Sequence, residues 1–282
     1  MIASFLLMLL AQSPAVGLDE QTTGLAKALP SSINSPGLGK PRTTDLRPWL
    51  WGAALQGNPQ QSFPHTRPRR SEVRGKIIGR VRIEGRIERP EWLKVFKNRD
   101  FCGTEIPDES FLASVGGGLQ NVVITIRGVR IEKPGRPLKR LVLDNRNCAF
   151  FPHVQVAQVG SEVLLLNSDP ILHDFHARLG SETLFNVGLP SWRRVEKRLT
   201  REGIVAIECE VLHTWMSAYI VVTSSPYFAV TDERGEFIIE GIPAGNYEIE
   251  VWHEKLGRLV RKVVVTRDRS SRVDPVFPCV SC

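Results

Sequence analysis

The chain has 282 residues, of which 42% are hydrophobic, so it can bury the core of one large domain or two ordinary ones. Its formal net charge is +7, and part of this excess lies in short runs such as Arg67, Arg69 and Arg70. No zinc-finger spacing, RNA-recognition signature or basic helix accompanies these runs, so we expect a solvent-exposed segment and no nucleic-acid partner.

The first residues predict export. Ile2–Ala11 is an apolar run as long as the hydrophobic region of a signal peptide, and Ala15-Val16-Gly17 offers small residues at a cleavage spacing. We therefore expect a signal peptide over residues 1–17 and a periplasmic or otherwise exported protein, in which disulfides are allowed. No later apolar segment reaches the length of a membrane span, so we expect none beyond the signal.

Residues 18–74 have no apolar periodicity, and prolines recur there among Ser, Thr, Gly and Gln, which is typical of a disordered linker. Beyond Gly75, many short apolar runs alternate with turn signals, and this pattern predicts an all-β sandwich protein. The only helical turn we expect lies around Asp108–Leu112. The expected strands are Lys76–Ile83, Asn121–Arg127, Leu138–Leu143, His153–Val159, Glu162–Asn167, Ile204–Glu208, Ala218–Thr223, Glu236–Glu240, Tyr247–His253 and Leu259–Thr266.

Two apolar runs flank Gly160, and this pattern predicts a hairpin. The hairpin would bring His153 to the end of the sheet where the loop after Asn167 begins. That loop contains His173 and His176, which face opposite ways if the segment is extended. His153 and His176 are therefore additional metal-ligand candidates, hydrogen-bond partners of a ligand, or exposed imidazoles.

The stretch from Val205 to Val222 carries the most distinctive chemistry, because Cys209, His213 and Met216 lie within eight residues of one another. Two imidazoles, a thiolate and a weak axial thioether are the ligand set of electron-transfer copper. The preceding loop, which carries His173 and His176, could supply the second imidazole. The alternative is that Cys209 and Met216 are core residues and His213 caps a turn.

The order of these motifs resembles plastocyanin, a member of the cupredoxin family. The resemblance implies a Greek-key β-sandwich with a mononuclear copper site, in which His173, Cys209 and His213 are equatorial ligands and Met216 is axial. Three residues separate Cys209 from His213, where plastocyanin has two. The Cys-x3-His-x2-Met spacing is instead similar to CuA domains, but Val205 stands where their second bridging cysteine lies, so we expect a single copper ion.

Residues 227–266 contain the pattern T-D-x-x-G-x-F…G-I-P-A-G-x-Y, which resembles the non-catalytic carboxypeptidase regulatory-like domain, a transthyretin-type β-sandwich. We expect a cupredoxin-like domain over 75–223, a regulatory-like domain over 224–268 and a C-terminal tail over 269–282. Strand Lys76–Ile83 could complete the second domain. Together with D-F-C-G, C-A-F-F-P-H-V and V-W-H-E-K-L-G, these motifs resemble exported bacterial proteins of the methylamine-utilisation type.

Four cysteines lie outside the Val205–Val222 stretch. Cys102 and Cys148 each adjoin a turn and form the natural disulfide pair, whose loop closure would contribute roughly 4 kcal/mol; the alternative is two free buried thiols. Cys279 and Cys282 form C-x-x-C without a following His, which excludes haem attachment. A small disulfide loop, a metal clip and an intermolecular link remain open for that pair.

These features predict an exported copper protein that carries electrons to or from a redox partner such as a periplasmic cytochrome. No nucleophile–base pair, carboxylate dyad or phosphate-binding loop is evident, so we expect no enzyme activity. Two alternatives remain open: a copper storage or delivery protein, and a metal-free structural or envelope-binding module.

Overall fold

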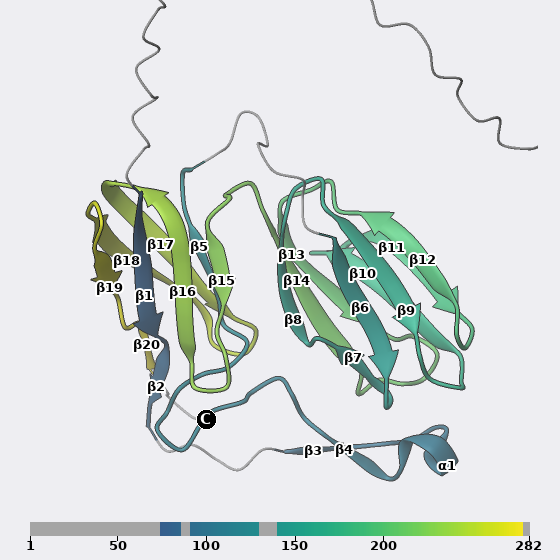
Figure 1. Ribbon diagram of the computed structural model, residues 1–282. Coiled ribbons are helices and arrows are strands. Elements are labelled where there is room, and N and C mark those ends of the chain that lie inside the picture. Colours follow the sequence, from purple (N-terminus) through teal and green to yellow (C-terminus); the bar gives the residue numbers. More distant parts are fainter. Residues whose placement is uncertain (1–73, 86–90, 130–139, 279–282) are drawn as a thin grey trace, which may run out of the picture. The chain divides into compact units, whose positions relative to one another are not determined.

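The computed structural model describes residues 74–85, 91–129 and 140–278 (Figure 1). Contacts divide the chain into the units 1–64 and 65–282, and every described residue lies in the second unit. The expected signal peptide, the linker up to residue 73 and the cysteines Cys279 and Cys282 lie outside the described residues. The described part consists of strands and one short helix, which confirms the prediction of an all-β protein. It contains no helix long and apolar enough to cross a membrane.

The first sandwich consists of two sheets with the strand orders β11-β10-β13-β14-β8 and β12-β9-β6-β7. The two sheets share one core, to which β9 contributes Val163 and Leu165 and β13 contributes Val205 and Ile207. The strands are β6 (Leu141–Arg146), β7 (Ala149–Phe151), β8 (Val154–Gln158), β9 (Glu162–Asn167), β10 (His173–Leu179), β11 (Glu182–Leu189), β12 (Arg194–Arg198), β13 (Gly203–Glu208) and β14 (Ser217–Thr223).

The expected hairpin around Gly160 is wrong, because β8 and β9 belong to different sheets. β8 pairs with β14, and β9 pairs with β6 and β12. The backbone of the turn is hydrogen-bonded toward both sheets. The Val159 N–H donates to the carbonyl of Thr223, at the end of β14, at 3.0 Å, and the Gly160 N–H donates to the carbonyl of Leu199, directly after β12, at 2.6 Å. Gly160, with φ of 92°, therefore carries the chain from one sheet to the other.

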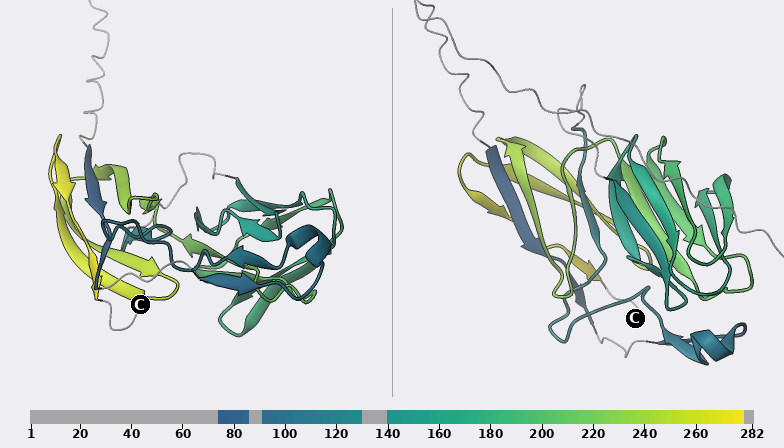
Figure 2. Two further views of the ribbon diagram at one scale, coloured as in Figure 1. Left: turned by 90° about the horizontal axis from the view of Figure 1, so that it is seen from below. Right: turned by 45° about the vertical axis from the view of Figure 1, so that its right-hand side comes forward.

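The second sandwich combines a sheet of order β16-β1-β19 with a sheet of order β15-β5-β17-β18 around its own core (Figure 2). A short pair, β2 with β20, adds to it through the core residues Ile83 and Phe277. The strands are β1 (Arg74–Arg80), β2 (Arg82–Glu84), β5 (Val123–Ile126), β15 (Phe228–Val230), β16 (Glu236–Pro243), β17 (Gly245–His253), β18 (Gly257–Val265), β19 (Ser270–Arg272) and β20 (Val276–Pro278).

This pairing corrects the expected domain boundaries. β1 pairs antiparallel with β16, so the run at residues 76–83 supplies a strand to the second sandwich, which was the alternative left open for it, and the second sandwich is discontinuous in sequence. β5 also belongs there, between β15 and β17, although it falls inside the range 75–223 assigned to the first sandwich. β19 and β20 lie in the expected tail at 269–282. Pairing between strands that are far apart in sequence decides which sandwich each strand belongs to, and for β5, β19 and β20 no local sequence pattern indicates it.

A small excursion of the chain completes the fold around the first sandwich. It comprises β3 (Trp92–Lys94), α1 (Arg99–Cys102) and β4 (Glu105–Pro107), and we refer to residues 92–107 as the strap. β3 and β4 pair antiparallel, and Cys102 forms a disulfide with Cys148, with the two Cα atoms 5.6 Å apart.

The helical turn expected at Asp108–Leu112 is wrong, and the helix α1 lies earlier, in the strap. The Asp108 carboxylate accepts the Ser110 backbone N–H at 2.8 Å. This short-range bond favours a turn over continued helix.

Candidate metal centre

Three strand ends bring the motif residues together. His173 is the first residue of β10, Cys209 directly follows β13, and His213 and Met216 lie in the loop between β13 and β14. β10 and β13 are adjacent antiparallel strands in which His176 faces Glu208, so the start of one strand lies beside the end of the other. The sequence predicted His173 in a loop, whereas the structure shows that it begins a strand.

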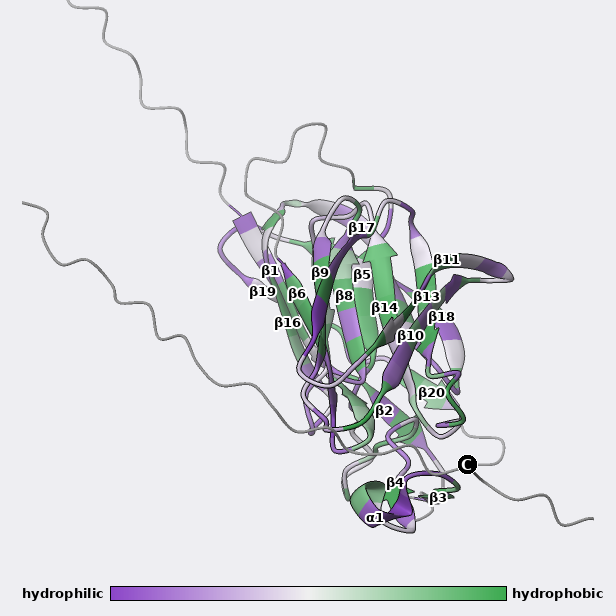
Figure 3. Ribbon diagram, turned by 90° about the vertical axis from the view of Figure 1, so that its right-hand side faces the viewer, coloured by the Kyte–Doolittle hydropathy of each residue, from purple (hydrophilic) through white to green (hydrophobic). Residues whose placement is uncertain are grey.

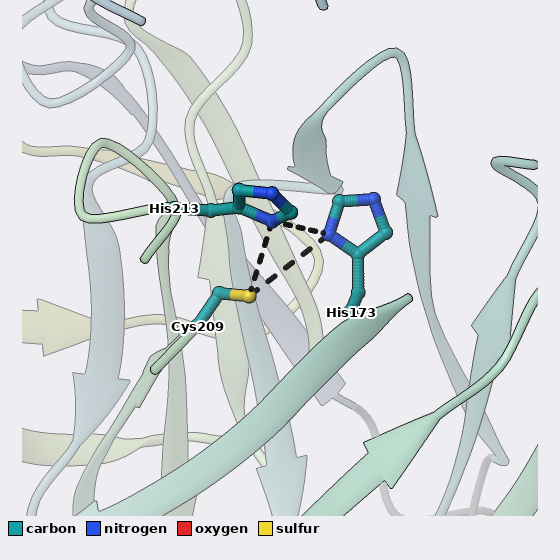
Figure 4. Close-up of side chains that lie close together, drawn as sticks. All are labelled: His173, Cys209 and His213. Atoms are coloured by element: carbon teal, nitrogen blue, oxygen red, sulfur yellow. Dashed lines mark hydrogen bonds between the residues drawn. The ribbon is translucent and has the colours of Figure 1, made fainter. Parts of the chain in front are cut away.

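His173, Cys209 and His213 form a compact buried cluster (Figure 4). The Cys209 sulfur lies 3.9 Å from Nδ1 of His173 and 3.6 Å from Nδ1 of His213, and the two Nδ1 atoms are 3.1 Å apart. The three side chains are at most 3% exposed. Three donor atoms of different residues thus converge on one point inside the protein.

The outer nitrogen of each imidazole has a hydrogen-bond acceptor. Nε2 of His173 lies 2.9 Å from the Asp169 carboxylate, and Nε2 of His213 lies 2.9 Å from the side-chain oxygen of Asn98. An acceptor at Nε2 selects the tautomer that carries its proton there, which leaves a lone pair on each Nδ1. Metal-binding histidines in proteins are held in this way.

In this tautomer, the three facing atoms, Nδ1 of His173, Nδ1 of His213 and Sγ of Cys209, share a single proton and cannot all be hydrogen-bonded to one another. Two Nδ1 lone pairs face each other at 3.1 Å, and neither ring can donate to the other in this tautomer. The Cys209 thiol has one proton and can serve only one of the two nitrogens. A cation at the point of convergence would satisfy all three atoms, so the donor set fits a bound metal ion.

Burial and neighbouring charges shift the ionisation of the cluster. Burial raises the pKa of the Cys209 thiol, although the Asp174 N–H donates to its sulfur at 3.3 Å and works in the opposite direction. Burial, together with the charges of His173 and Lys97, lowers the pKa of His213 to about 4. At neutral pH the His213 side chain is therefore neutral, and a metal ion would have to displace the thiol proton to bind Cys209.

Asp169 is the anchor of His173. Burial alone would raise the pKa of its carboxyl, but the hydrogen bond from His173 and those from the Cys148 and Asn147 backbone N–H groups together lower it. The carboxylate is thus ionised and only 2% exposed. The residues Cys148, Asp169 and His173 also lie close enough together to resemble a metal site, but the Cys148 sulfur is consumed by the disulfide.

Met216 lies in the interior beside the cluster residues. Its side chain is 2% exposed and packs in the same core as Cys209, and its backbone N–H donates to the His213 carbonyl at 2.9 Å. This bond closes a tight turn between the two residues. The assignment of Met216 as the axial ligand stays a prediction.

The other two candidate histidines have different partners. His153 pairs with the Glu254 carboxylate and packs edge-on against Tyr219, because the hairpin that would have brought it to His173 does not form. Both ring nitrogens of His176 are engaged, Nδ1 with Glu210 at 2.5 Å and Nε2 with Thr183 at 2.7 Å. Within the described residues, neither histidine joins the cluster of His173, Cys209 and His213.

Two residues of the site were missed in the sequence. Asp169 lies four positions before His173 in the N-S-D-P-I-L-H segment, so a carboxylate close to a candidate ligand was the available signal. Asn98 is separated from His213 by 115 positions, and no local pattern could connect them.

No protein-family model matches the sequence, and no curated protein matches it. Solved structures that resemble part of the chain include a copper-containing nitrite reductase (NirK) from Thermus scotoductus SA-01, at 21% identity over 33% of this chain and 24% of that one, with a TM-score of 0.28. A purple cupredoxin from Nitrosopumilus maritimus is 22% identical over 30% of this chain and 98% of its own, with a TM-score of 0.26.

A reduced amicyanin variant is 19% identical over 35% of this chain and 97% of its own, with a TM-score of 0.27. The present chain thus spans about a quarter of the nitrite reductase and nearly all of the two small proteins. The resemblance of residues 227–266 to a regulatory-like module finds no support in these comparisons and stays a prediction.

Proposed function

We propose that this protein binds a single copper ion through Nδ1 of His173, Sγ of Cys209 and Nδ1 of His213, with Met216 as a weak axial ligand, and that it carries electrons. The observation that carries the proposal is the convergence of two Nδ1 lone pairs and one sulfur while both Nε2 atoms are held by acceptors.

The chemistry of the donor set favours copper. Thiolate and imidazole together suit both oxidation states of copper, whereas a structural zinc site takes four strong ligands. Within the described residues three strong donors, His173, Cys209 and His213, converge on one point. Met216, which is buried in the same core as Cys209, is the weak fourth ligand of this proposal. When bound, copper would supply one-electron redox chemistry.

The rigidity of the surroundings supports an electron-carrying role. His173 and Cys209 lie at the ends of paired strands, and each imidazole has its outer nitrogen fixed. Ligands held in this way change little between oxidation states, so little reorganisation opposes electron transfer. The ligands are also almost fully buried, which favours a carrier over an enzyme that must admit a substrate.

We further propose export to the periplasm, with a redox partner such as a periplasmic cytochrome, and a non-catalytic presenting role for the second sandwich. Copper storage or delivery is the alternative function for the same site. The two differ in redox cycling: a carrier exchanges electrons quickly and keeps its metal, and a store releases its metal to an acceptor.

The test is spectroscopic. Addition of Cu(II) to the metal-free protein should produce an intense visible band from thiolate-to-copper charge transfer, and Cys209→Ser should abolish the band. A correctly folded wild-type protein with reduced Cys209 and no band would refute copper binding through this cysteine. Stopped-flow mixing with a reduced cytochrome then separates a carrier from a store.

A further inference from the structure

The strap covers the His213 side of the cluster. Its residue Val95 is fully buried in the core of the first sandwich, and Lys97 donates from Nζ to the Val211 carbonyl at 3.2 Å, inside the loop between Cys209 and His213. Asn98 follows directly and accepts the hydrogen bond from Nε2 of His213. The strap thus touches the backbone of the ligand loop and the outer edge of one ligand, and His213 is only 1% exposed.

The Asn98 side chain does not cap its own helix but contacts His213. Asn98 is the N-cap of α1, where an asparagine side chain normally accepts a backbone N–H of its own helix. Here it makes no side-chain cap bond and adopts the left-handed conformation, with φ of 55°. Its side chain is instead directed to His213, across 115 positions of sequence. The local stability that a cap would provide is given up for contact with the cluster.

The Cys102–Cys148 disulfide connects the neighbours of Asn98 and Asp169, the two residues that hold the imidazoles. On one side, the Cys102 backbone N–H donates to the Asn98 carbonyl at 2.8 Å, one helical turn away. On the other side, the Cys148 backbone N–H donates to the Asp169 carboxylate at 2.9 Å. Asn98 and Asp169 are therefore linked through one covalent bond and two short hydrogen bonds. Without the disulfide, α1 has no buried residue of its own to keep it in place.

We propose that the strap is a cover on the His173–Cys209–His213 cluster, with the Asn98 side chain as its latch and the Cys102–Cys148 disulfide as its anchor, and that opening of this cover sets how fast metal ions and small reagents reach the cluster. Asn98 is then a positioning residue, since it acts on the site through His213. The part of this inference that concerns metal rests on the proposed copper function; the part that concerns access to Cys209 does not.

The first test uses the metal-free full chain and needs no bound metal. Native protein is treated with iodoacetamide, and alkylation of the peptide that contains Cys209 is followed by mass spectrometry, which keeps Cys279 and Cys282 out of the measurement. Asn98→Gly retains the left-handed backbone and removes the acceptor, and Asn98→Asp retains an acceptor. Phe96→Ala alters an exposed side chain of the same strap and is the matched control.

We expect Asn98→Gly to speed alkylation by about tenfold, which corresponds to ~1.4 kcal/mol in the opening equilibrium. The double variant Cys102→Ser with Cys148→Ser should speed it further, while Asn98→Asp and Phe96→Ala stay near wild type. Equal rates in wild type and Asn98→Gly would overturn the proposal. Equally fast rates in the Gly and Asp variants would overturn the role of the side chain as the latch.

The second test measures release of Cu(I) from the loaded protein to bicinchoninate. The Asn98→Gly variant should release copper faster and show a shifted charge-transfer band, and Asn98→Asp, which keeps an acceptor for His213, should restore slow release. If Asn98 only supported the strap and did not position His213, the band of Asn98→Gly would match that of wild type. A wild-type protein that binds no copper would refute the proposed function, and the alkylation rates would still decide whether the strap is a cover. Because the Gly and Asp variants keep the disulfide, these comparisons hold even if the double cysteine variant does not fold.

Discussion

Asp169 offers the sharpest test of how the metal centre is built, through the substitution Asp169→Asn. The carboxylate accepts three hydrogen bonds, from Nε2 of His173 and from the backbone N–H groups of Asn147 and Cys148, and is 2% exposed. An asparagine of nearly the same volume has only one acceptor oxygen. Its NH2 group would face at least one of these donors, so the substitution leaves buried polar groups without partners.

The magnitude follows from those contacts. Each buried group left unsatisfied costs about 1–3 kcal/mol, so we expect Asp169→Asn to lower the free energy of unfolding of the metal-free protein by about 2–4 kcal/mol. His173 also loses the partner that fixes its tautomer. Loss of such a partner typically weakens metal binding by about 10–100-fold.

Urea denaturation of the metal-free protein and competition for copper with a chelator of known affinity measure the two effects. Asp232→Asn is the matched control, because the Asp232 carboxylate also accepts two backbone N–H groups, from Arg234 and Glu236, but lies in an exposed turn. It should cost less than about 1 kcal/mol and leave copper affinity unchanged. Equal stability and equal affinity of Asp169→Asn and wild type would refute the inference that Asp169 anchors His173.

Three further predictions concern other parts of the chain. Burial, with the charges of His153 and Lys255, lowers the pKa of His253 to about 4, below the 6.5 of an unfolded histidine. The unfolded chain therefore binds more protons between these values, and His253 should contribute a loss of stability of up to about 3 kcal/mol as the pH drops from 6.5 to 4, in addition to the loss from His213. Urea midpoints of the chelator-treated protein across this range check it. His253→Asn should lower by up to one the number of protons taken up on unfolding, which sets the slope of unfolding free energy against pH. Met216→Leu keeps the buried volume and should leave stability within about 1.5 kcal/mol, while altering the visible spectrum and reduction potential of the copper form; unchanged spectra would remove Met216 from the ligand set. Gly235→Ala should cost about 2 kcal/mol or more, because φ is +77° and a Cβ would lie 2.4 Å from the Val81 carbonyl oxygen; an unfolding midpoint equal to wild type would contradict this close packing.

The candidate ligands that form the His173–Cys209–His213 cluster could be predicted from the sequence because their chemistry is concentrated in two short segments. Thiol, imidazole and thioether lie within eight residues at Cys209–Met216, and His173 lies in one preceding segment, N-S-D-P-I-L-H. The residues that orient these ligands could not be predicted in the same way. Asn98 meets His213 only after the strap has folded back on the sandwich, and nothing local marks it.

Two strands that the sequence did not predict, β10 and β12, lack the apolar alternation that marks a strand. β10 begins with the polar residues His173 and Asp174, and hydrophilic residues dominate it, whereas β14 is largely hydrophobic (Figure 3). β12 alternates but has only Val195 as an apolar residue. An alternating run of apolar residues was the signal for a strand, and strands rich in polar residues, buried in β10 and exposed in β12, do not give it.

The error at Gly160 has a different origin. β9 alternates cleanly between buried and half-buried residues, and β8 is partly buried, so both were recognised as strands. A tight glycine turn is compatible with a hairpin in one sheet and with a connection between two facing sheets. The choice depends on which strands lie alongside, here β14 and β6, and these come from elsewhere in the chain. His153 was therefore assigned to the wrong neighbourhood.

The charges around the proposed copper ion follow from the same contacts. Two imidazoles and one thiolate would give the metal-bound ligand set a single negative charge, and the ionised Asp169 carboxylate adds a second one next to His173. In a buried site such charges are weakly screened and favour the more positive oxidation state of the metal. With copper bound, the Asp169 carboxylate would therefore stabilise Cu(II) relative to Cu(I) and lower the reduction potential. Asn98, a neutral acceptor, fixes His213 without this effect, so the two imidazoles are held by groups with separable consequences for geometry and potential.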